Sequence, residues 1–213
     1  MEQEAGCQLF LVVEAGESAP DRLAAALEVV PIASVLIVPP AGQCLAEASA
    51  KPLVEQAQAQ GAAALVLDDV DLARKLRADG VHLQHSKDIE SRYRAARQAL
   101  GRGAIIGVHA GKSRHDAMVV AEEGAEYVAF GLPEGVTDSA SARERRLDLV
   151  AWWAEIFEVP CVALDVAKPE DAAELARAGA DFIGLTLRAG EPLSNIEQRM
   201  RAMAEAAQSA LAE

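Results

Sequence analysis

Apolar and polar positions follow a repeating unit along the chain: a short apolar run, a polar loop, an amphipathic stretch and a glycine before the next apolar run. The apolar runs are continuous rather than alternating, which is typical of parallel strands buried on both faces beneath helices. They predict eight strands, at residues 8–14, 34–39, 64–67, 80–83, 105–109, 127–131, 161–165 and 182–187. The amphipathic stretches predict helices at 21–30, 52–60, 70–78, 89–100, 114–123, 145–157, 170–178 and from 196 onward.

Glycine recurs where a predicted helix meets the next strand, at Gly61, Gly80, Gly124 and Gly179. Glycine suits the left-handed residue that commonly ends a helix. Eight strand–helix units in 213 residues are economical for a closed (β/α)8 TIM barrel. The main alternative is a doubly wound open sheet, which usually carries a glycine-rich first turn that residues 15–20 lack. We therefore predict an α/β fold with one TIM-barrel domain over residues 1–213.

Composition limits the partners this chain can have. Hydrophobic residues make up 51% of the chain and aromatic residues only 4%, so the core is expected to be aliphatic. Lys and Arg number 20 against 33 Asp and Glu, a net charge of −13. This charge argues against nucleic acid and anionic membranes, which both require a basic surface. A small phosphorylated molecule remains compatible with a few local donors, and association into a homo-oligomer stays open.

The cysteines and the N-terminus indicate a cytoplasmic protein. Cys7, Cys44 and Cys161 are widely spaced and odd in number, which disfavours a disulfide framework or a zinc site. The first residues are acidic, without the basic segment of a secretory signal. No apolar run reaches the roughly 18 residues of a membrane span.

Chemistry in a TIM barrel lies on the loops that follow the strand C-termini. The carboxylates of Asp68 and Asp88, which follow neighbouring strands, are candidates to share a Mg²⁺ ion. In the competing interpretation, one aspartate of the pair Asp68 and Asp69 caps the next helix and the other faces solvent. Gly131 and Asp165 end two further strands and are expected at the same rim.

Three basic residues near strand ends are candidates for the site. His109 ends a predicted strand and lies where a pocket is expected, and Lys112 follows it at the start of a helix, where backbone N–H groups attract anions. Arg188 follows the last strand, a place where many barrels bind phosphate, although the pattern somewhat favours a surface arginine.

Other conspicuous residues have simpler structural explanations. His82 lies inside a strand and is expected to be structural. Trp152 and Trp153 are more typical of core or subunit packing than of a stacking platform. The basic run 143–146 is interpreted as a solvated helix start rather than a binding patch.

Three segments resemble the thiamine-phosphate synthases and their thiazole-tautomerase relatives. LVLDDVDLA at 65–73, followed by ADGVHL at 78–83, looks like the family's "IVNDDVDLA…ADGVHLGQED". IIGVHA at 105–110, followed by EEGAEYVAFG at 122–131, looks like "IIGVSAH…EEAGADYVGFGP", and 169–181 looks like "TPENAAELLAAGADGVAV". The resemblance implies a TIM barrel that joins a phosphorylated hydroxyethylthiazole to an aminopyrimidine methyl diphosphate, releasing diphosphate with the help of Mg²⁺.

Carried over residue by residue, the resemblance retains few functional groups. Asp68 matches a metal ligand, whereas the second metal aspartate falls on Lys87 unless an insertion brings Asp88 into register. Among the substrate-binding candidates, Asp69 and Gly131 match family residues, but His109 stands at the diphosphate-binding serine. The remaining departures are residues 36–40 at the "QxREK" motif, Leu67 at the asparagine of "NDD", Gly111 at the tautomerase histidine, 132–138 at the "PTxTK" loop, Asp165-Val166 at a glycine pair and Leu187 at a late serine.

Two hypotheses follow. In the first, the chain is a degenerate thiamine-phosphate synthase with weak or lost activity and weak or absent Mg²⁺ binding, because diphosphate transfer needs concentrated positive charge around the leaving group. In the second, it is a non-catalytic barrel that binds a small anion or a protein partner. The first hypothesis would be favoured if five side chains converged on one open cavity: those of Asp68, Asp88, His109, Lys112 and Arg188.

Overall fold

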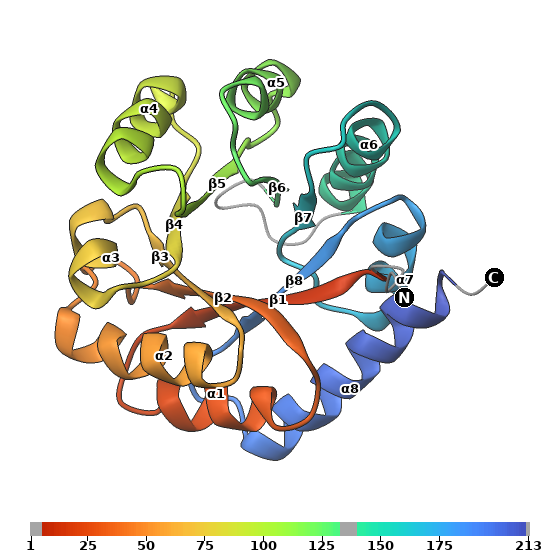
Figure 1. Cartoon of the computed structure of the whole chain (residues 1–213). Coiled ribbons are helices and arrows are strands. Elements are labelled where there is room, and N and C mark those ends of the chain that lie inside the picture. The colour runs from red at the N-terminus through yellow and green to blue at the C-terminus, as the bar shows by residue number, and fades with distance from the viewer. Residues whose placement is uncertain (1–5, 133–139, 212–213) are drawn as a thin grey trace, which may run out of the picture.

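The computed structural model describes residues 6–132 and 140–211, which form a closed barrel of eight parallel strands, each followed by a helix. The strands are ordered β1 to β8 around the barrel, and β1 pairs with β8 to close it. Figure 1 shows the helices arranged around the outside of the strands. The predicted TIM-barrel fold is confirmed.

Most predicted elements lie within a few residues of the observed ones. The strands are β1 Gln8–Glu14, β2 Ile32–Val38, β3 Ala63–Leu67, β4 Gly80–Leu83, β5 Ile105–His109, β6 Tyr127–Phe130, β7 Cys161–Ala163 and β8 Phe182–Leu187. The helices are α1 Ala19–Leu27, α2 Glu47–Ala59, α3 Val70–Leu76, α4 Ile89–Leu100, α5 Arg114–Glu122, α6 Ala140–Ile156, α7 Pro169–Arg177 and α8 Leu193–Ser209.

Two boundaries differ for a local reason. Helix α2 begins at Glu47 rather than at the predicted Pro52, which lies inside the helix. Proline inside a helix removes one backbone N–H donor, and this helix tolerates the loss. Strand β7 ends at Ala163 rather than at Asp165, because Asp165 adopts a left-handed backbone conformation with φ 59°. Of the predicted loop 132–138, residues after Leu132 lie outside the described residues.

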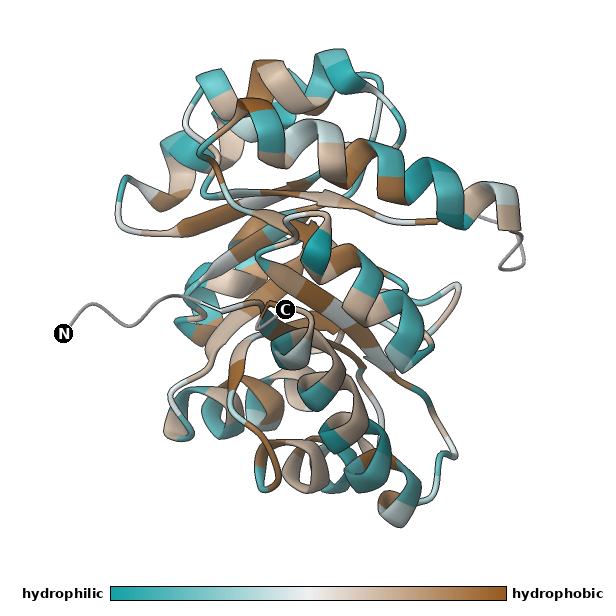
Figure 2. Ribbon diagram, turned by 90° about the vertical axis from the view of Figure 1, so that its right-hand side faces the viewer, coloured by the Kyte–Doolittle hydropathy of each residue, from teal (hydrophilic) through white to brown (hydrophobic). Residues whose placement is uncertain are grey.

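Alternate strand residues face two different apolar layers. On β1, Leu9 and Leu11 pack with residues between the strands and the helices, whereas Phe10 faces the barrel interior. The interior cluster consists of Phe10, Leu36, Leu65, Tyr127, Ala129, Val162 and Leu164. Both faces of each strand are therefore buried, which explains the continuous apolar runs. In Figure 2 the strands are largely brown, while the helices carry most of the hydrophilic colour.

A glycine makes room for the one tyrosine of the interior cluster. Gly107 on β5 pairs with Tyr127 on β6, and a Cβ atom at Gly107 would lie 1.8 Å from the Tyr127 ring. Real Cβ atoms never approach a ring so closely, so only glycine fits at this position. The interior layer is close-packed at this level, and open space is left to the ends of the strands.

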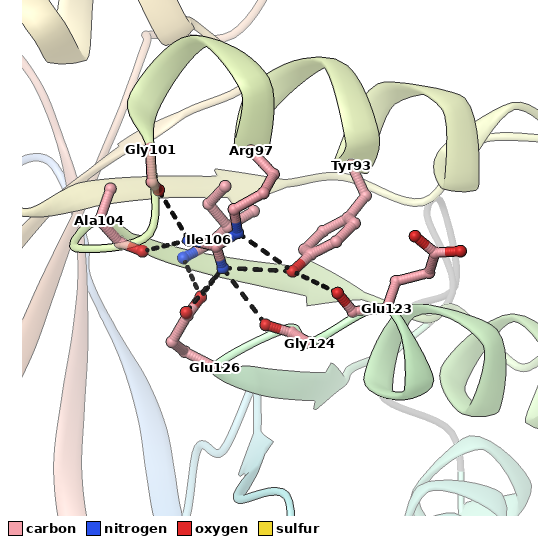
Figure 3. A network of polar contacts seen from close by, with 8 residues as sticks. All are labelled: Tyr93, Arg97, Gly101, Ala104, Ile106, Glu123, Gly124 and Glu126. Carbon is pink, nitrogen blue, oxygen red and sulfur yellow. Dashed lines mark hydrogen bonds and ion pairs between the residues drawn. The ribbon is translucent and has the colours of Figure 1, made fainter.

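A polar network around Arg97 ties α4 to the start of β5 and β6 (Figure 3). The Arg97 guanidinium forms an ion pair with Glu126 at 2.6 Å, and the Glu126 carboxylate accepts a hydrogen bond from the Ile106 N–H at 2.7 Å. Arg97 also donates to Tyr93 Oη and to the carbonyls of Gly101, Ala104 and Gly124. The network lies at the N-terminal ends of the strands, opposite the candidate site, where a structural role is expected.

Across residues 6–132 and 140–211, none of the helices combines the length and the apolar composition that crossing a bilayer requires.

Candidate functional site

A cavity of about 910 Å³ opens at the C-terminal ends of the strands. Its floor is apolar, with Val12, Leu36 and Leu67 from β1, β2 and β3. Its described polar lining residues are His82, Gln84, His85, His109, Lys112, Arg145, Arg146, Asp165, Thr186, Arg188, Glu191 and Arg199. Of the predicted site residues, the structure brings His109, Lys112, Gly131 and Arg188 together in this wall.

His109 and Asp165 converge on Gly131. A Cβ atom at Gly131 would lie 2.7 Å from Asp165 Oδ2 and 3.0 Å from His109 Nε2. Asp165 Oδ2 also accepts a hydrogen bond from the Leu132 N–H at 2.9 Å. Because Gly131 has no side chain, an imidazole and a carboxylate can share this part of the cavity wall.

The cavity wall is mainly basic. Lys112 follows β5, Arg188 follows β8 and Arg145 lies on α6, and within the described ranges no carboxylate pairs with any of the three. Arg199 of α8 differs, because it forms a bidentate ion pair with Glu191 and donates to the Thr186 carbonyl. Three cations therefore remain available to an anionic ligand, whereas Asp165 and the Arg199-paired Glu191 are the carboxylates in the described part of the lining.

The basic run 143–146 corrects one sequence interpretation. We expected a solvated helix start, but Arg145 and Arg146 both line the cavity, and Arg146 is only 2% exposed. Arg146 Nη1 donates to the carbonyls of Leu164 and Asp165 at 2.6 and 3.0 Å. It thereby supports the left-handed turn that directs the Asp165 carboxylate into the wall. The predicted solvated face holds for part of this run, since Glu144 and Arg145 are exposed, Arg145 at the cavity mouth.

His82 contributes to the cavity lining but is almost fully buried. Its Nδ1 atom is 2.7 Å from Tyr127 Oη, and its side chain is stacked against the Tyr127 ring. Burial, with a smaller contribution from nearby His109, lowers the pKa of His82 from 6.5 to about 3. The imidazole is therefore neutral at physiological pH, as its place in the apolar barrel interior requires. This agrees with the structural role expected for it.

The three candidate aspartates lie at the same end of the barrel but outside the cavity lining. The Asp69 carboxylate caps α3 by accepting from the Leu72 N–H at 2.9 Å. The Asp68 carboxylate accepts from the Gln84 N–H and forms an ion pair with Arg92. The capping interpretation is thus confirmed for Asp69, while Asp68 is ion-paired instead of simply solvated.

These residues do not fit the Mg²⁺ site that the resemblance implies. A Mg²⁺ ion needs carboxylate oxygens, and Asp68 is already engaged by a guanidinium. The Asp88 carboxylate is hydrogen-bonded to Ser86, an interaction that lowers the pKa of Asp88. Throughout the part of the chain that the structure describes, no group of three or more His, Cys, Asp or Glu side chains converges.

Sequence reasoning missed several cavity residues. His85 follows β4, and its Nε2 atom lies 3.1 Å from Asp116 Oδ2 on α5. Its ring also packs over Gly111, where a Cβ atom would lie 3.0 Å away. The position of His85 just after a strand was a usable signal. Arg145, Glu191 and Arg199 carried none, because they lie on helices or in a polar loop, where charged residues usually face solvent.

Comparison with known proteins agrees with the resemblance seen in the sequence. The family model described as "Thiamine monophosphate synthase" matches residues 9–187. A thiamine-phosphate synthase from Erythrobacter litoralis is 38% identical over 192 residues, covering 87% of this chain and 89% of that protein. One from Rhodospirillum centenum is 37% identical over 188 residues, covering 84% of this chain and 87% of that protein.

A solved structure shares the fold. Thiamine phosphate pyrophosphorylase from Pyrococcus furiosus superposes with a TM-score of 0.74 and covers 98% of this chain and 100% of its own, at 19% identity. At that identity the likeness shows the barrel alone. The family follows from the sequence matches, which span most of the chain and of each relative: this protein belongs to the thiamine monophosphate synthase family.

Proposed function

We propose that this protein is a cytoplasmic thiamine-phosphate synthase homologue that binds a phosphorylated substrate of that reaction in the barrel mouth and turns it over weakly. The observation that carries the proposal is the set of three cations, Lys112, Arg145 and Arg188, around one cavity without carboxylate partners among the described residues. Its three cysteines are free thiols, which suits a reducing compartment.

The cation set supports phosphate binding from two sides of the cavity. Lys112 lies two residues before the start of α5, whose N-terminal N–H groups favour an anion, and Arg188 follows β8 on the opposite part of the wall. Arg145 approaches from α6. Gly131 exposes backbone to the cavity beside His109, and His109 is the residue placed to exchange a proton with a bound ligand.

Weak turnover follows from what surrounds these cations. Transfer to a thiazole with loss of diphosphate requires preorganised positive charge and donors at the leaving group. The end of β2, where the resemblance places an arginine and a lysine, contributes apolar Leu36 and Val38 to the cavity. Asp165 adds a carboxylate where the resemblance places glycine. Asp69 stays a predicted substrate-binding residue, although its carboxylate is already committed to capping α3.

Calorimetry with the hydroxyethylthiazole phosphate tests binding. We expect Lys112→Ala and Arg188→Ala each to weaken affinity roughly tenfold or more, because a charge-assisted hydrogen bond contributes about 1.5–3 kcal/mol. Arg102→Ala is the matched control, since Arg102 is an exposed arginine just before β5, at the opposite end of the barrel. Equal affinity in all four proteins would contradict the proposal.

A steady-state assay with both substrates and Mg²⁺ tests turnover. We expect a rate at least about 10²-fold below that of an ordinary synthase, the usual cost of losing one donor to a developing charge. A rate equal to that of an ordinary synthase, abolished by His109→Ala, would overturn this expectation and show a rebuilt catalytic site. Binding without any turnover would instead identify a non-catalytic anion-binding barrel.

A further inference from the structure

Arg92 on α4 bridges two segments that end at the barrel mouth. Its Nη2 atom lies 2.5 Å from Asp68 Oδ1, just after β3. Its Nη1 atom donates to the Gln84 carbonyl at 3.0 Å and to Ser86 Oγ at 3.1 Å, both in the loop between β4 and α4. One guanidinium therefore connects the end of β3 to this loop.

The same guanidinium is linked to the second candidate metal residue. Ser86 Oγ accepts from Arg92 and lies two residues before Asp88. Arg92 thus contacts Asp68 directly and, through one hydroxyl, the segment that leads to Asp88. These are the two carboxylates that sequence reasoning assigned to a shared Mg²⁺ ion.

The chemistry of this arrangement disfavours a divalent ion on the Asp68 carboxylate. Asp68 Oδ1 already accepts two hydrogen bonds, from Arg92 and from the Gln84 N–H at 2.9 Å. A Mg²⁺ ion on that carboxylate would lie within a few ångströms of the guanidinium, and like charges at that distance repel strongly. The Asp68 side chain is 34% exposed, so solvent moderates this repulsion without removing it.

We infer that Arg92 is a built-in substitute for the divalent cation, neutralising Asp68 and fixing the loop that places Gln84 and His85 in the cavity wall. The loop is held from its other side as well, because His85 contacts Asp116 and packs over Gly111. Arg92 is accordingly a positioning residue. It does not line the cavity itself.

The inference concerns the free protein and is tested with metal alone, so its outcome is independent of the proposed substrate. The probe is Mn²⁺, followed by electron paramagnetic resonance. We expect the wild-type protein to show no site tighter than about 1 mM, near the weak limit for oxygen-ligand sites. Arg92→Gln should gain Mn²⁺ affinity by roughly tenfold or more, because it removes a positive charge beside two carboxylates. The double variant Arg92→Gln with Asp68→Asn should lose that gain.

Arg94→Gln is the matched control. Arg94 lies on the same helix and pairs with Glu90 and Glu123, away from Asp68. Arg94→Gln changes the net charge of the protein by the same amount as Arg92→Gln. A general electrostatic effect would therefore raise Mn²⁺ affinity in both variants. An equal gain in Arg94→Gln, or no gain in a folded Arg92→Gln protein, would overturn the inference.

A measurement on the wild-type protein keeps the inference testable even if Arg92→Gln fails to fold. Bound Mn²⁺ broadens the amide resonances of nearby residues. We expect the amides of Asp68, Gln84 and Arg92 to broaden no more than the amide of Arg94 at about 1 mM Mn²⁺. Selective broadening at Asp68 and Gln84, abolished by Asp68→Asn, would show that a divalent ion binds there despite Arg92.

Discussion

The carboxylate of Asp165 and the imidazole of His109 point to the same place above the Cα atom of Gly131. Asp165 Oδ2 would be 2.7 Å, and His109 Nε2 3.0 Å, from a Cβ atom built there. Relative to the family pattern, both residues are departures, one at a glycine and the other at a serine. The two departures from the family pattern therefore alter the same part of the cavity wall. Gly131, which matches the family, has no side chain and so lets the Asp165 carboxylate and the His109 ring lie close together.

Gly131→Ala is expected to disrupt this point. The added methyl group must displace the Asp165 carboxylate and the His109 ring, which costs about 1–3 kcal/mol of folding free energy as overpacking and weakens thiazole-phosphate binding. Urea unfolding and calorimetry measure the two effects. Gly16→Ala is the control, because nothing lies within 4 Å of a Cβ atom there. If the two alanine variants behave alike, the close approach at Gly131 has been misjudged.

Asp165→Gly is expected to strengthen anion binding. The change removes a carboxylate from a cavity with three available cations, and a unit charge at about 6 Å changes affinity by roughly tenfold. Glycine also adopts the left-handed conformation of this position, φ 59°, without steric cost. Calorimetry with inorganic phosphate measures the gain. Asp165→Asn separates the causes, since it removes the charge and keeps the side chain. Weaker phosphate binding in both variants would mean that Asp165 serves the ligand.

Stability should fall on acidification because of His82. Its pKa is about 3 in the folded protein and about 6.5 in the unfolded chain, so between these values the unfolded chain binds one more proton. The contribution of neutral His82 to the free energy of unfolding is complete above pH 6.5. It is lost as the pH falls from 6.5 towards 3, at up to about 1.4 kcal/mol per pH unit.

Urea unfolding at a series of pH values measures this loss. The slope of the unfolding free energy against pH counts the protons taken up on unfolding. His82→Gln, which can still hydrogen-bond Tyr127, should lower that count by one between pH 3 and 6.5. His115→Gln, at an exposed histidine, should leave it unchanged. An identical slope in wild type and His82→Gln would contradict the buried neutral state.

Arg97→Ala is expected to destabilise the barrel without affecting ligand binding. It leaves the Glu126 carboxylate and three backbone carbonyls without their guanidinium partner, and breaking such a part-buried pair costs about 3 kcal/mol. Thermal unfolding measures the loss. Arg94→Ala, which breaks a more exposed ion pair on the same helix, should cost less than about 1 kcal/mol. Equal costs would show that the network in Figure 3 contributes no more than a surface pair.

Helix boundaries were less predictable than strands. The β4 and β5 ranges were predicted residue for residue, because a strand buried on both faces is uniformly apolar and stops where the apolar run stops. Helix α2 was predicted to start at Pro52, but it starts at Glu47. Pro52 lies inside this helix, a place that proline usually disrupts, so the local pattern favoured a later start.

By itself, the sequence determined the barrel and which residues lie near its mouth. Eight buried strands with short connections leave few alternatives to closure, and parallel strands bring their C-terminal ends to one rim. His109, Lys112, Gly131 and Arg188 were therefore predictable as neighbours from their places at the ends of the apolar runs.

Only the tertiary structure decided how the charges pair. Asp68 and Arg92 are 24 residues apart, and no local pattern shows that a guanidinium takes the carboxylate expected to bind a metal. Arg145 likewise looks like an ordinary solvated residue in a helix, yet α6 directs it into the cavity. Charge pairing depends on which side chains come within a few ångströms after the barrel closes, and that distance is a property of the packed chain rather than of any segment.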